Sequence, residues 1–185
     1  MKAADILSKF SMEGVAIKSY CSASDDELLM VLDWRNDPEI RKFMFTTDEI
    51  KVSEHLEYAR GLEGREDRFY FIVIREGTYI GSIAVTEADY RNKSAFLGIY
   101  ARPDEAIKGA GQTLMHAICK IVFDAMEFHS LRLEVLESNE RAIRFYEKFG
   151  FKTDGVLREV YSKQGIYENV LIMSMLEREY RGRYE

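Results

Sequence analysis

The chain has 185 residues, a length that predicts one domain, or one domain with a short appendage. Hydrophobic residues make up 46% of the chain and charged residues 31%, which is typical of a globular protein with its own core. The formal net charge is −6 and the two signs are interleaved along the sequence, which argues against a general nucleic-acid or membrane-surface binder, because such proteins concentrate basic residues on one face.

The first third of the chain predicts one strand followed by helices. In residues 14–20, apolar and polar residues alternate as in a half-buried strand. Asp25 or Asp26 is the expected cap of a helix that ends near residue 36. Pro38 suits the first turn of a short second helix, and a third helix is expected from Ser53 to about residue 64.

The remaining elements follow from changes in the spacing of apolar residues. Aromatic and β-branched residues predict strands, and apolar residues three and four apart predict helices. Strands are expected at 69–74, 79–85, 94–100, 131–136, 151–161 and 167–175, with a long helix after Gly111 and another over 139–149. This order predicts a mixed α/β fold, with one sheet covered on both faces.

The sequence shows no internal repeat and no linker-like segment. We expect one domain over residues 13–178, a variable lead-in at 1–12 and a C-terminal tail at 179–185. The sequence contains no apolar run of membrane-spanning length and no pattern of a signal peptide. Two cysteines, Cys21 and Cys119, are too few for a disulfide framework. We therefore expect a cytoplasmic protein with reduced thiols.

A glycine-containing loop opens the long helix. Residues 108–113 read Lys-Gly-Ala-Gly-Gln-Thr and follow the strand that ends near Tyr100. Glycines at a helix start let the backbone approach a ligand, and the free N–H groups there favour an anion such as a pyrophosphate. A pair of glycines is weak evidence by itself, and a flexible loop before a helix is the alternative.

A second segment has a more specific pattern. After the strand that ends at Leu136, the chain reads Asn139-x-x-Ala-x-x-Phe-Tyr146-x-x-x-Gly-Phe151. This resembles the last conserved block of the GCN5-related N-acetyltransferase (GNAT) superfamily, and the upstream glycines resemble its acetyl-CoA pyrophosphate loop. The resemblance implies a GNAT fold, in which a single, mostly antiparallel mixed sheet is splayed between its fourth and fifth strands. One departure is Ala106, where the family usually has Gln or Arg.

Two narrower resemblances concern the acceptor. Residues 34–40 resemble the start of the branch that acetylates ribosomal proteins and aminoglycosides. Residues 96–100, 129–135 and 145–148 resemble the acetyltransferases of the pseudaminic-acid pathway, which acetylate the 4-amino group of a UDP-linked 4-amino-4,6-dideoxy sugar. This resemblance implies direct transfer from acetyl-CoA to a small nucleotide-sugar substrate. His116 and His129 lack metal-ligand spacing, so we expect no metal.

The family resemblance implies where acetyl-CoA binds. Pantetheine would lie between the splayed strands, and backbone N–H groups near Ile99 would polarise the thioester carbonyl. The implied cofactor-binding residues are Leu97, Gly98, Ile99, Tyr100, Lys108, Gly109, Ala110, Gly111, Gln112, Thr113, Asn139 and Tyr146.

Two residues are the candidates for catalysis. By resemblance, Tyr146 gives a proton to the leaving thiolate; the alternative is an aromatic residue that only packs in the core. Glu134 alternates with apolar neighbours on a strand, where burial would raise its pKa and suit it to act as a base. The alternative for Glu134 is a salt bridge, for example with Arg132.

The acceptor is expected to meet polar and aromatic residues of the first half. The candidates are Arg35, Asn36 and His55 for a diphosphate, with Met44, Phe45 and Trp34 against a base or sugar. The alternative for Arg35 is a surface ion pair, and the alternative for His55 is a solvent-exposed position on a helix. Other acceptors remain open, namely a protein N-terminus or an aminoglycoside, as does a non-catalytic acyl-CoA-binding module. We expect no nucleic-acid or membrane partner, and a homodimer paired through exposed edge strands.

Overall fold

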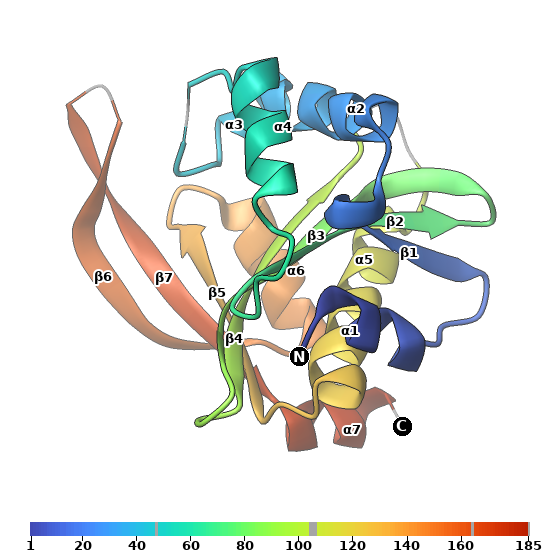
Figure 1. Ribbon diagram of the computed structural model, residues 1–185. Helices are drawn as coiled ribbons and strands as arrows, with labels where there is room; N and C mark the ends of the chain where they lie inside the picture. The colour runs from blue at the N-terminus through green and yellow to red at the C-terminus, as the bar shows by residue number, and fades with distance from the viewer. Residues whose placement is uncertain (47, 104–106, 164, 185) are drawn as a thin grey trace.

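The centre of the molecule is one seven-stranded sheet (Figure 1). The computed structural model describes residues 1–46, 48–103, 107–163 and 165–184. The strand order is β1-β2-β3-β4-β5-β7-β6. The strands are β1 (Val15–Ser19), β2 (Phe69–Arg75), β3 (Thr78–Asp89), β4 (Ser94–Ala101), β5 (Ser130–Leu136), β6 (Lys152–Lys163) and β7 (Ile166–Leu176).

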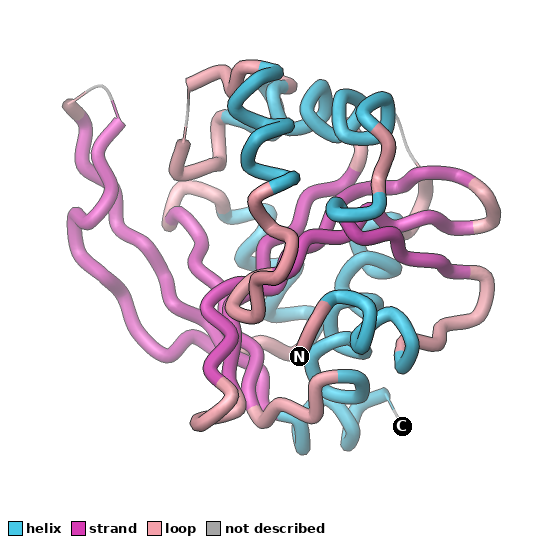
Figure 2. Tube along the Cα trace, in the orientation of Figure 1, coloured by secondary structure: helices cyan, strands magenta, loops and turns pink. Residues whose placement is uncertain are grey.

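Helices lie on both sides of this sheet (Figures 1 and 2). The helices are α1 (Ala3–Lys9), α2 (Asp25–Asn36), α3 (Pro38–Arg41), α4 (Val52–Arg60), α5 (Ala110–Cys119), α6 (Glu140–Phe149) and α7 (Glu177–Tyr184). A short 3-10 turn, η1 (Tyr20–Ser22), follows β1, and α5 continues into a π-helical segment, η2 (Lys120–Ala125). No helix in the described ranges is both long and apolar enough to cross a membrane.

The sheet opens between its fourth and fifth strands, as the family resemblance implied. All described strand pairs are antiparallel except β4 with β5. These two parallel strands pair only from Ser94 opposite Ser130 to Phe96 opposite Arg132. Beyond Phe96 the strands diverge, so the edge of β4 that faces β5 is left without a strand partner and its backbone polar groups can bind a ligand.

Two apolar cores lie on the two faces of the sheet, and β2 shows how the sequence produces them. Because alternate residues of a strand face opposite sides, Phe71 and Val73 enter the main core, which also receives α5 and η2. Ile72 between them enters the smaller core beneath α2 and α4. The apolar residues spaced three and four apart on α5 and η2 are fully buried: Leu114, Ala117, Ile118, Ile121, Val122 and Ala125.

Both ends that the sequence analysis set apart from the domain pack against it. Residues 3–9 form α1, and Ile6 is fully buried in the main core. At the other end, α7 buries Tyr180 in the same core. These segments are therefore part of the folded unit.

Several predicted boundaries shift by a few residues. Ser24 caps α2, instead of the predicted Asp25 or Asp26, because its hydroxyl accepts from the Glu27 N–H while the Glu27 carboxylate accepts from the Ser24 N–H. The long helix begins at Ala110, inside the glycine pair, with Gly109 as its cap at φ 79°. Only a glycine adopts this left-handed conformation without strain.

Candidate active site

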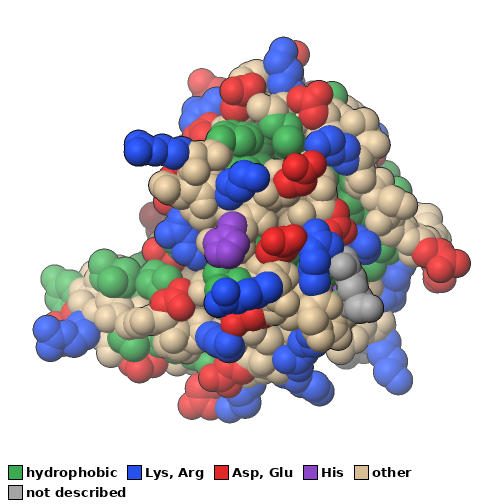
Figure 3. All heavy atoms as spheres, turned by 90° about the horizontal axis from the view of Figure 1, so that it is seen from below, with side chains coloured by type: hydrophobic (Ala, Val, Ile, Leu, Met, Phe, Trp, Pro, Cys, Tyr) green, Lys and Arg blue, Asp and Glu red, His purple; other side chains and the backbone are tan. Residues whose placement is uncertain are grey.

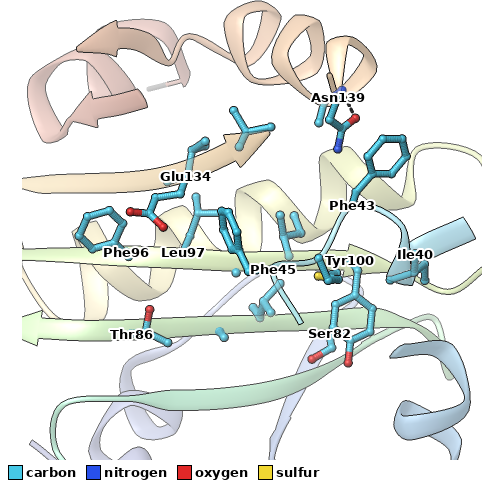
Figure 4. A pocket seen from close by; sticks show the side chains of 18 of the residues that line it. Ile40, Phe43, Phe45, Ser82, Thr86, Phe96, Leu97, Tyr100, Glu134 and Asn139 are labelled. Carbon is cyan, nitrogen blue, oxygen red and sulfur yellow. Dashed lines mark hydrogen bonds between the residues drawn. The ribbon is translucent and has the colours of Figure 1, made fainter. Parts of the chain in front are cut away.

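A cleft of about 510 Å³ occupies the opening between β4 and β5. One wall is residues 96–100 of β4 and the other is residues 133–136 of β5. Figure 4 shows Glu134 projecting from β5 toward Phe96 and Leu97, with Ser82 and Tyr100 at the other end of the cleft. The predicted residues that line it are Arg35, Met44, Phe45, Leu97, Gly98, Ile99, Tyr100, Glu134, Asn139 and Tyr146.

A second, smaller cleft of about 300 Å³ lies at the start of α5. Its walls include Gly109, Ala110 and Gly111, together with Arg102 and Arg141. N–H groups in the first turn of α5 have no partner within the helix, and the helix dipole favours negative charge there. Tyr100 belongs to the first cleft and the next residue, Ala101, to the second, so the two clefts adjoin along β4. This arrangement fits a long ligand whose phosphates lie at α5.

The glycine loop is held in place by Arg75, a residue that the sequence analysis missed. Its Nη1 donates to Thr113 Oγ1 at 3.0 Å and its Nη2 donates to the Lys108 carbonyl at 3.1 Å. Thr113 is buried and its hydroxyl also donates to the Gly109 carbonyl, so this side chain shapes the loop. Lys108 and Gln112, in contrast, are exposed on the loop.

Tyr146 lies at the α6 side of the cleft, beside Asn139. Desolvation raises the pKa of Tyr146 to about 12, so the phenol keeps its proton at neutral pH and can donate it. Its ring also packs against Phe145 and Phe151, with centroids 5.6 and 5.9 Å away. Tyr146 therefore both packs against other aromatic side chains and lines the cleft. Asn139 caps α6, because its Oδ1 accepts from the Ala142 N–H (Figure 4); its amide nitrogen is a separate donor.

Glu134 faces the cleft but is exposed, whereas we expected a buried side chain. Its neighbours Leu133 and Val135 are buried on the other face of β5, since alternate residues point to opposite sides. The pKa of Glu134 is nevertheless raised, first by desolvation and then by the charge of Glu87. The expected partner Arg132 instead stacks on the Phe96 ring and donates to Ser94.

Glu87 is a second carboxylate in the cleft that the sequence did not indicate. It lies on β3 at a register shift between Thr86 and Asp89, with φ 51°. Such a β-bulge re-aims a side chain, and a local sequence pattern gives no sign of it. A non-glycine residue in this left-handed conformation is strained, and strain of this kind clusters at functional sites.

Arg35 and Asn36 have different positions relative to the cleft. Arg35 lines it; Nη2 donates to the Thr46 carbonyl at 2.9 Å, and Nη1 is buried with no hydrogen-bond partner among the described residues. Asn36 does not reach the cleft. Its side-chain amide bonds to the backbone of Ile50: Nδ2 donates to the carbonyl at 2.8 Å, and Oδ1 accepts from the N–H at 2.9 Å.

His55 also lies away from the cleft, contrary to the prediction for the acceptor. It is buried beside Tyr20, with ring centroids 6.1 Å apart, and burial lowers its pKa. A neutral imidazole in this place is a poor partner for a diphosphate. Trp34, considered as a base-stacking residue, is buried in the smaller core.

Another part of the cleft wall is residues 43–45, which lie between α3 and α4 and belong to no helix or strand. It carries Met44, as predicted, and two aromatic side chains, Phe43 and Phe45, that are 38% and 46% exposed. Exposed aromatic side chains at a cleft supply apolar contact area to a ligand. Over the described residues, no three metal-ligating side chains form a group. Ala106 lies outside the described residues.

Comparisons with known proteins agree with this geometry. Residues 28–151 match the acetyltransferase (GNAT) family. The chain is 32% identical over 137 residues to the acetyltransferase PseH of Campylobacter jejuni, an alignment that covers 74% of this chain and 84% of that protein. It is 27% identical over 128 residues to the spermidine N(1)-acetyltransferase of Vibrio cholerae, covering 69% of this chain and 74% of that one.

Among solved structures, the fold is similar to the crystal structure of Vibrio cholerae spermidine N-acetyltransferase in complex with CoA and spermine. The TM-score is 0.82 at 23% identity, over 92% of this chain and 99% of the other. At this identity the likeness describes the fold alone.

Proposed function

The chain belongs to the acetyltransferase (GNAT) family and is an N-acetyltransferase that uses acetyl-CoA; from this premise, we propose that its acceptor is the 4-amino group of a UDP-linked 4-amino-4,6-dideoxy sugar, as in pseudaminic-acid biosynthesis. We further propose that acetyl transfer is direct, because the fully buried thiol of Cys119 has its pKa strongly raised and is a poor nucleophile. The second cysteine, Cys21, is not among the residues that line the cleft. Both cysteines are free, which supports the cytoplasm as the compartment.

In this proposal, acetyl-CoA supplies the thioester and lies in the opening beside β4. The pyrophosphate meets the N–H groups at Gly109–Gly111, and the backbone of Leu97–Tyr100 binds pantetheine. Glu134 takes the proton of the acceptor amine, for which its raised pKa suits it. Tyr146, which keeps its proton at neutral pH, gives that proton to the leaving thiolate.

Arg35 carries the proposal for a nucleotide-linked acceptor. Its Nη1 is buried in the cleft wall and has no hydrogen-bond partner in the described part of the chain. A buried N–H donor without an acceptor is costly, and an anionic group on the acceptor substrate would offset that cost. The similarity to PseH supports the same acceptor, while Phe45 and Met44 would pack against the base or sugar.

A polyamine is the second candidate acceptor. Among the described residues, the carboxylates of Glu39, Glu87 and Glu134 line the cleft, and a polycation is attracted by such a set. The similarity to a spermidine acetyltransferase points the same way. An acceptor that lay along the Glu87 side of the cleft would meet these carboxylates before Arg35, which favours a polyamine there.

The deciding experiment measures CoA release from acetyl-CoA with separate acceptors: the UDP-4-amino sugar, spermidine, an aminoglycoside and N-terminal peptides. Turnover with the sugar nucleotide, inhibited by UDP, supports the proposal. Turnover with spermidine alone would overturn it. Arg35→Met separates the two further, because it should raise the KM of the sugar nucleotide about tenfold or more and lower or leave unchanged that of spermidine.

We also propose that the protein forms a homodimer through the free edge of β6. Every described side chain from Lys152 to Val160 on this strand is exposed, and Figure 3 shows apolar side chains gathered on the part of the surface that projects where the β6–β7 hairpin lies. With Val156 on a two-fold axis, antiparallel pairing places Asp154 of one copy opposite Arg158 of the other. Val156→Lys should convert the dimer to a monomer in sedimentation; an unchanged mass, or a monomeric wild type, would overturn this.

A further inference from the structure

Residues 42–46 and 48–50, called segment 42–50 below, include Phe43, Met44 and Phe45 of the cleft wall. Side chains from other parts of the molecule bond to the backbone of this segment. Three alternate carbonyls each accept a hydrogen bond. Lys163 Nζ donates to Lys42 O at 3.3 Å, Tyr161 Oη donates to Met44 O at 3.2 Å, and Arg35 Nη2 donates to Thr46 O at 2.9 Å. The amide of Asn36 fixes the far end of the segment, at Ile50.

Two of these anchors come from the β6–β7 hairpin, more than a hundred residues along the chain. Tyr161 also packs its ring edge-on against Phe45, with centroids 5.5 Å apart. The hairpin itself is fixed near this point, because the Glu159 N–H donates to Asn169 Oδ1 at 2.8 Å and the Asn169 amide donates to Glu137. The register shift between Leu157 and Tyr161 marks a bulge, and a bulge bends its strand.

We propose that Tyr161, assisted by Lys163, is a positioning residue for the acceptor: it sets where Phe43, Met44 and Phe45 stand in the cleft. This deepens the proposed function and rests on it. Within the segment, the N–H groups of Phe43 and Met44 bond back to Ile40 O and Arg41 O, whereas the carbonyls of Lys42, Met44 and Thr46 bond to the anchors. Both aromatic side chains are substantially exposed, and an exposed apolar side chain gains little from staying in one place. The anchoring bonds therefore decide the shape of the acceptor wall, whereas the acetyl-CoA side does not depend on them.

The chain offers variants that separate the two contacts of Tyr161. Tyr161→Phe removes the bond to Met44 O and keeps the ring against Phe45, whereas Tyr161→Ala removes both. Lys163→Met removes the bond to Lys42 O and keeps the apolar stem. The control is Tyr167→Phe, since Tyr167 is 65% exposed on the neighbouring strand β7.

The first readout needs no acceptor. Hydrogen–deuterium exchange would be followed in peptides over 42–50, where the amides of Phe43 and Met44 donate to Ile40 O and Arg41 O, each at 3.1 Å. We expect exchange there to quicken about threefold to tenfold in Tyr161→Phe, the effect of one neutral hydrogen bond, and more in Tyr161→Ala. Unchanged exchange in Tyr161→Ala would overturn the proposal.

The second readout is steady-state kinetics with the UDP-4-amino sugar and acetyl-CoA. We expect the KM of the sugar nucleotide to rise by a similar factor, while the KM of acetyl-CoA, the kcat and the melting temperature stay as in Tyr167→Phe. Equal changes in both KM values would show a general structural effect and overturn the positioning role. If no sugar nucleotide is turned over by the wild type, the proposed acceptor fails, and the exchange result still decides whether Tyr161 holds the segment.

Discussion

Glu134 on β5 and Glu87 on β3 face one cleft from strands on either side of β4. The pKa of Glu134 is raised first by desolvation and then by the charge of Glu87. A negative charge nearby disfavours the ionised form of a carboxyl group. The proton affinity of the proposed base is therefore set partly by a residue that need not touch the reacting atoms. This relationship can be tested by removing the second charge.

Glu87→Gln should lower the pKa of Glu134 toward its ordinary value. The acid limb of the pH profile of kcat/KM would then move to lower pH, because the base is already deprotonated there. Glu134→Gln should lower kcat/KM by about a hundredfold or more. The loss should be largest above the pKa of Glu134 and below that of the acceptor amine, where the wild-type base is ionised and the amine is still protonated. If the acid limb of the pH profile stays in place in Glu87→Gln, the charge of Glu87 does not influence the proposed base.

Removing the charge of Glu134 should stabilise the protein at neutral pH, although it lowers the activity. A carboxyl whose pKa is raised in the folded state contributes stability that is fully present below its unfolded pKa and is lost as the pH rises through the folded value. At pH 7 the charged Glu134 therefore costs stability. Glu134→Gln should raise the melting temperature at pH 7, by less than about 2 °C because solvent screens the exposed side chain, and the gain should vanish near pH 4. A lower melting temperature at pH 7 would contradict the pKa shift.

Tyr146→Phe should lower kcat by about a hundredfold, within the usual range for general acid catalysis, and leave the Kd of acetyl-CoA within twofold. Because the pKa of Tyr146 is raised to about 12, its ionisation should cause no loss of wild-type rate below about pH 10. Pre-steady-state CoA release and equilibrium binding would measure the two quantities. An unchanged kcat would remove Tyr146 from the chemistry; the same change at Tyr167 serves as the control.

Arg75→Met should weaken acetyl-CoA binding about tenfold, since it removes two bonds that shape the pyrophosphate loop, to Thr113 and to the Lys108 carbonyl. The acceptor KM should be unchanged. Isothermal titration with acetyl-CoA measures the effect, and the exposed Arg91 gives a matched Arg→Met control. Equal affinity in the two variants would show that the loop keeps its shape without Arg75.

Gly81→Ala should destabilise the protein by about 1–3 kcal/mol or more, because a Cβ at this position would lie 2.5 Å from the Tyr100 carbonyl oxygen and 2.7 Å from Leu114 Cδ1. Backbone must move to relieve this contact, and that backbone borders both clefts. Urea unfolding measures the loss. Gly155→Ala, on β6, has open space around the new methyl group and should be close to neutral; a similar loss there would refute the steric explanation.

The sequence predicted the elements well because their signals are local. Alternation in β2 and the apolar spacing in α5 are visible within a dozen residues, and the splay of β4 from β5 came with the family pattern around Asn139 and Tyr146. The errors concern distant partners. Asn36 has a side chain suited to a ligand, but the backbone of Ile50 takes up its hydrogen-bonding groups. Arg75 and Glu87 were missed because a tertiary contact and a bulge determine their roles.

The hydrogen bonds that anchor segment 42–50 end on main-chain atoms, so they do not depend on which side chains the segment carries. The Tyr161 ring adds a side-chain contact, to Phe45. Substitutions at Phe43 or Phe45 leave the carbonyls of Lys42, Met44 and Thr46 in place for Lys163, Tyr161 and Arg35 to bind. The side chains of Phe43 and Phe45 can therefore be changed while the hydrogen bonds to the backbone of the segment remain. Libraries confined to residues 43–45 are a direct route to enzymes with altered acceptor preference and unaltered handling of acetyl-CoA.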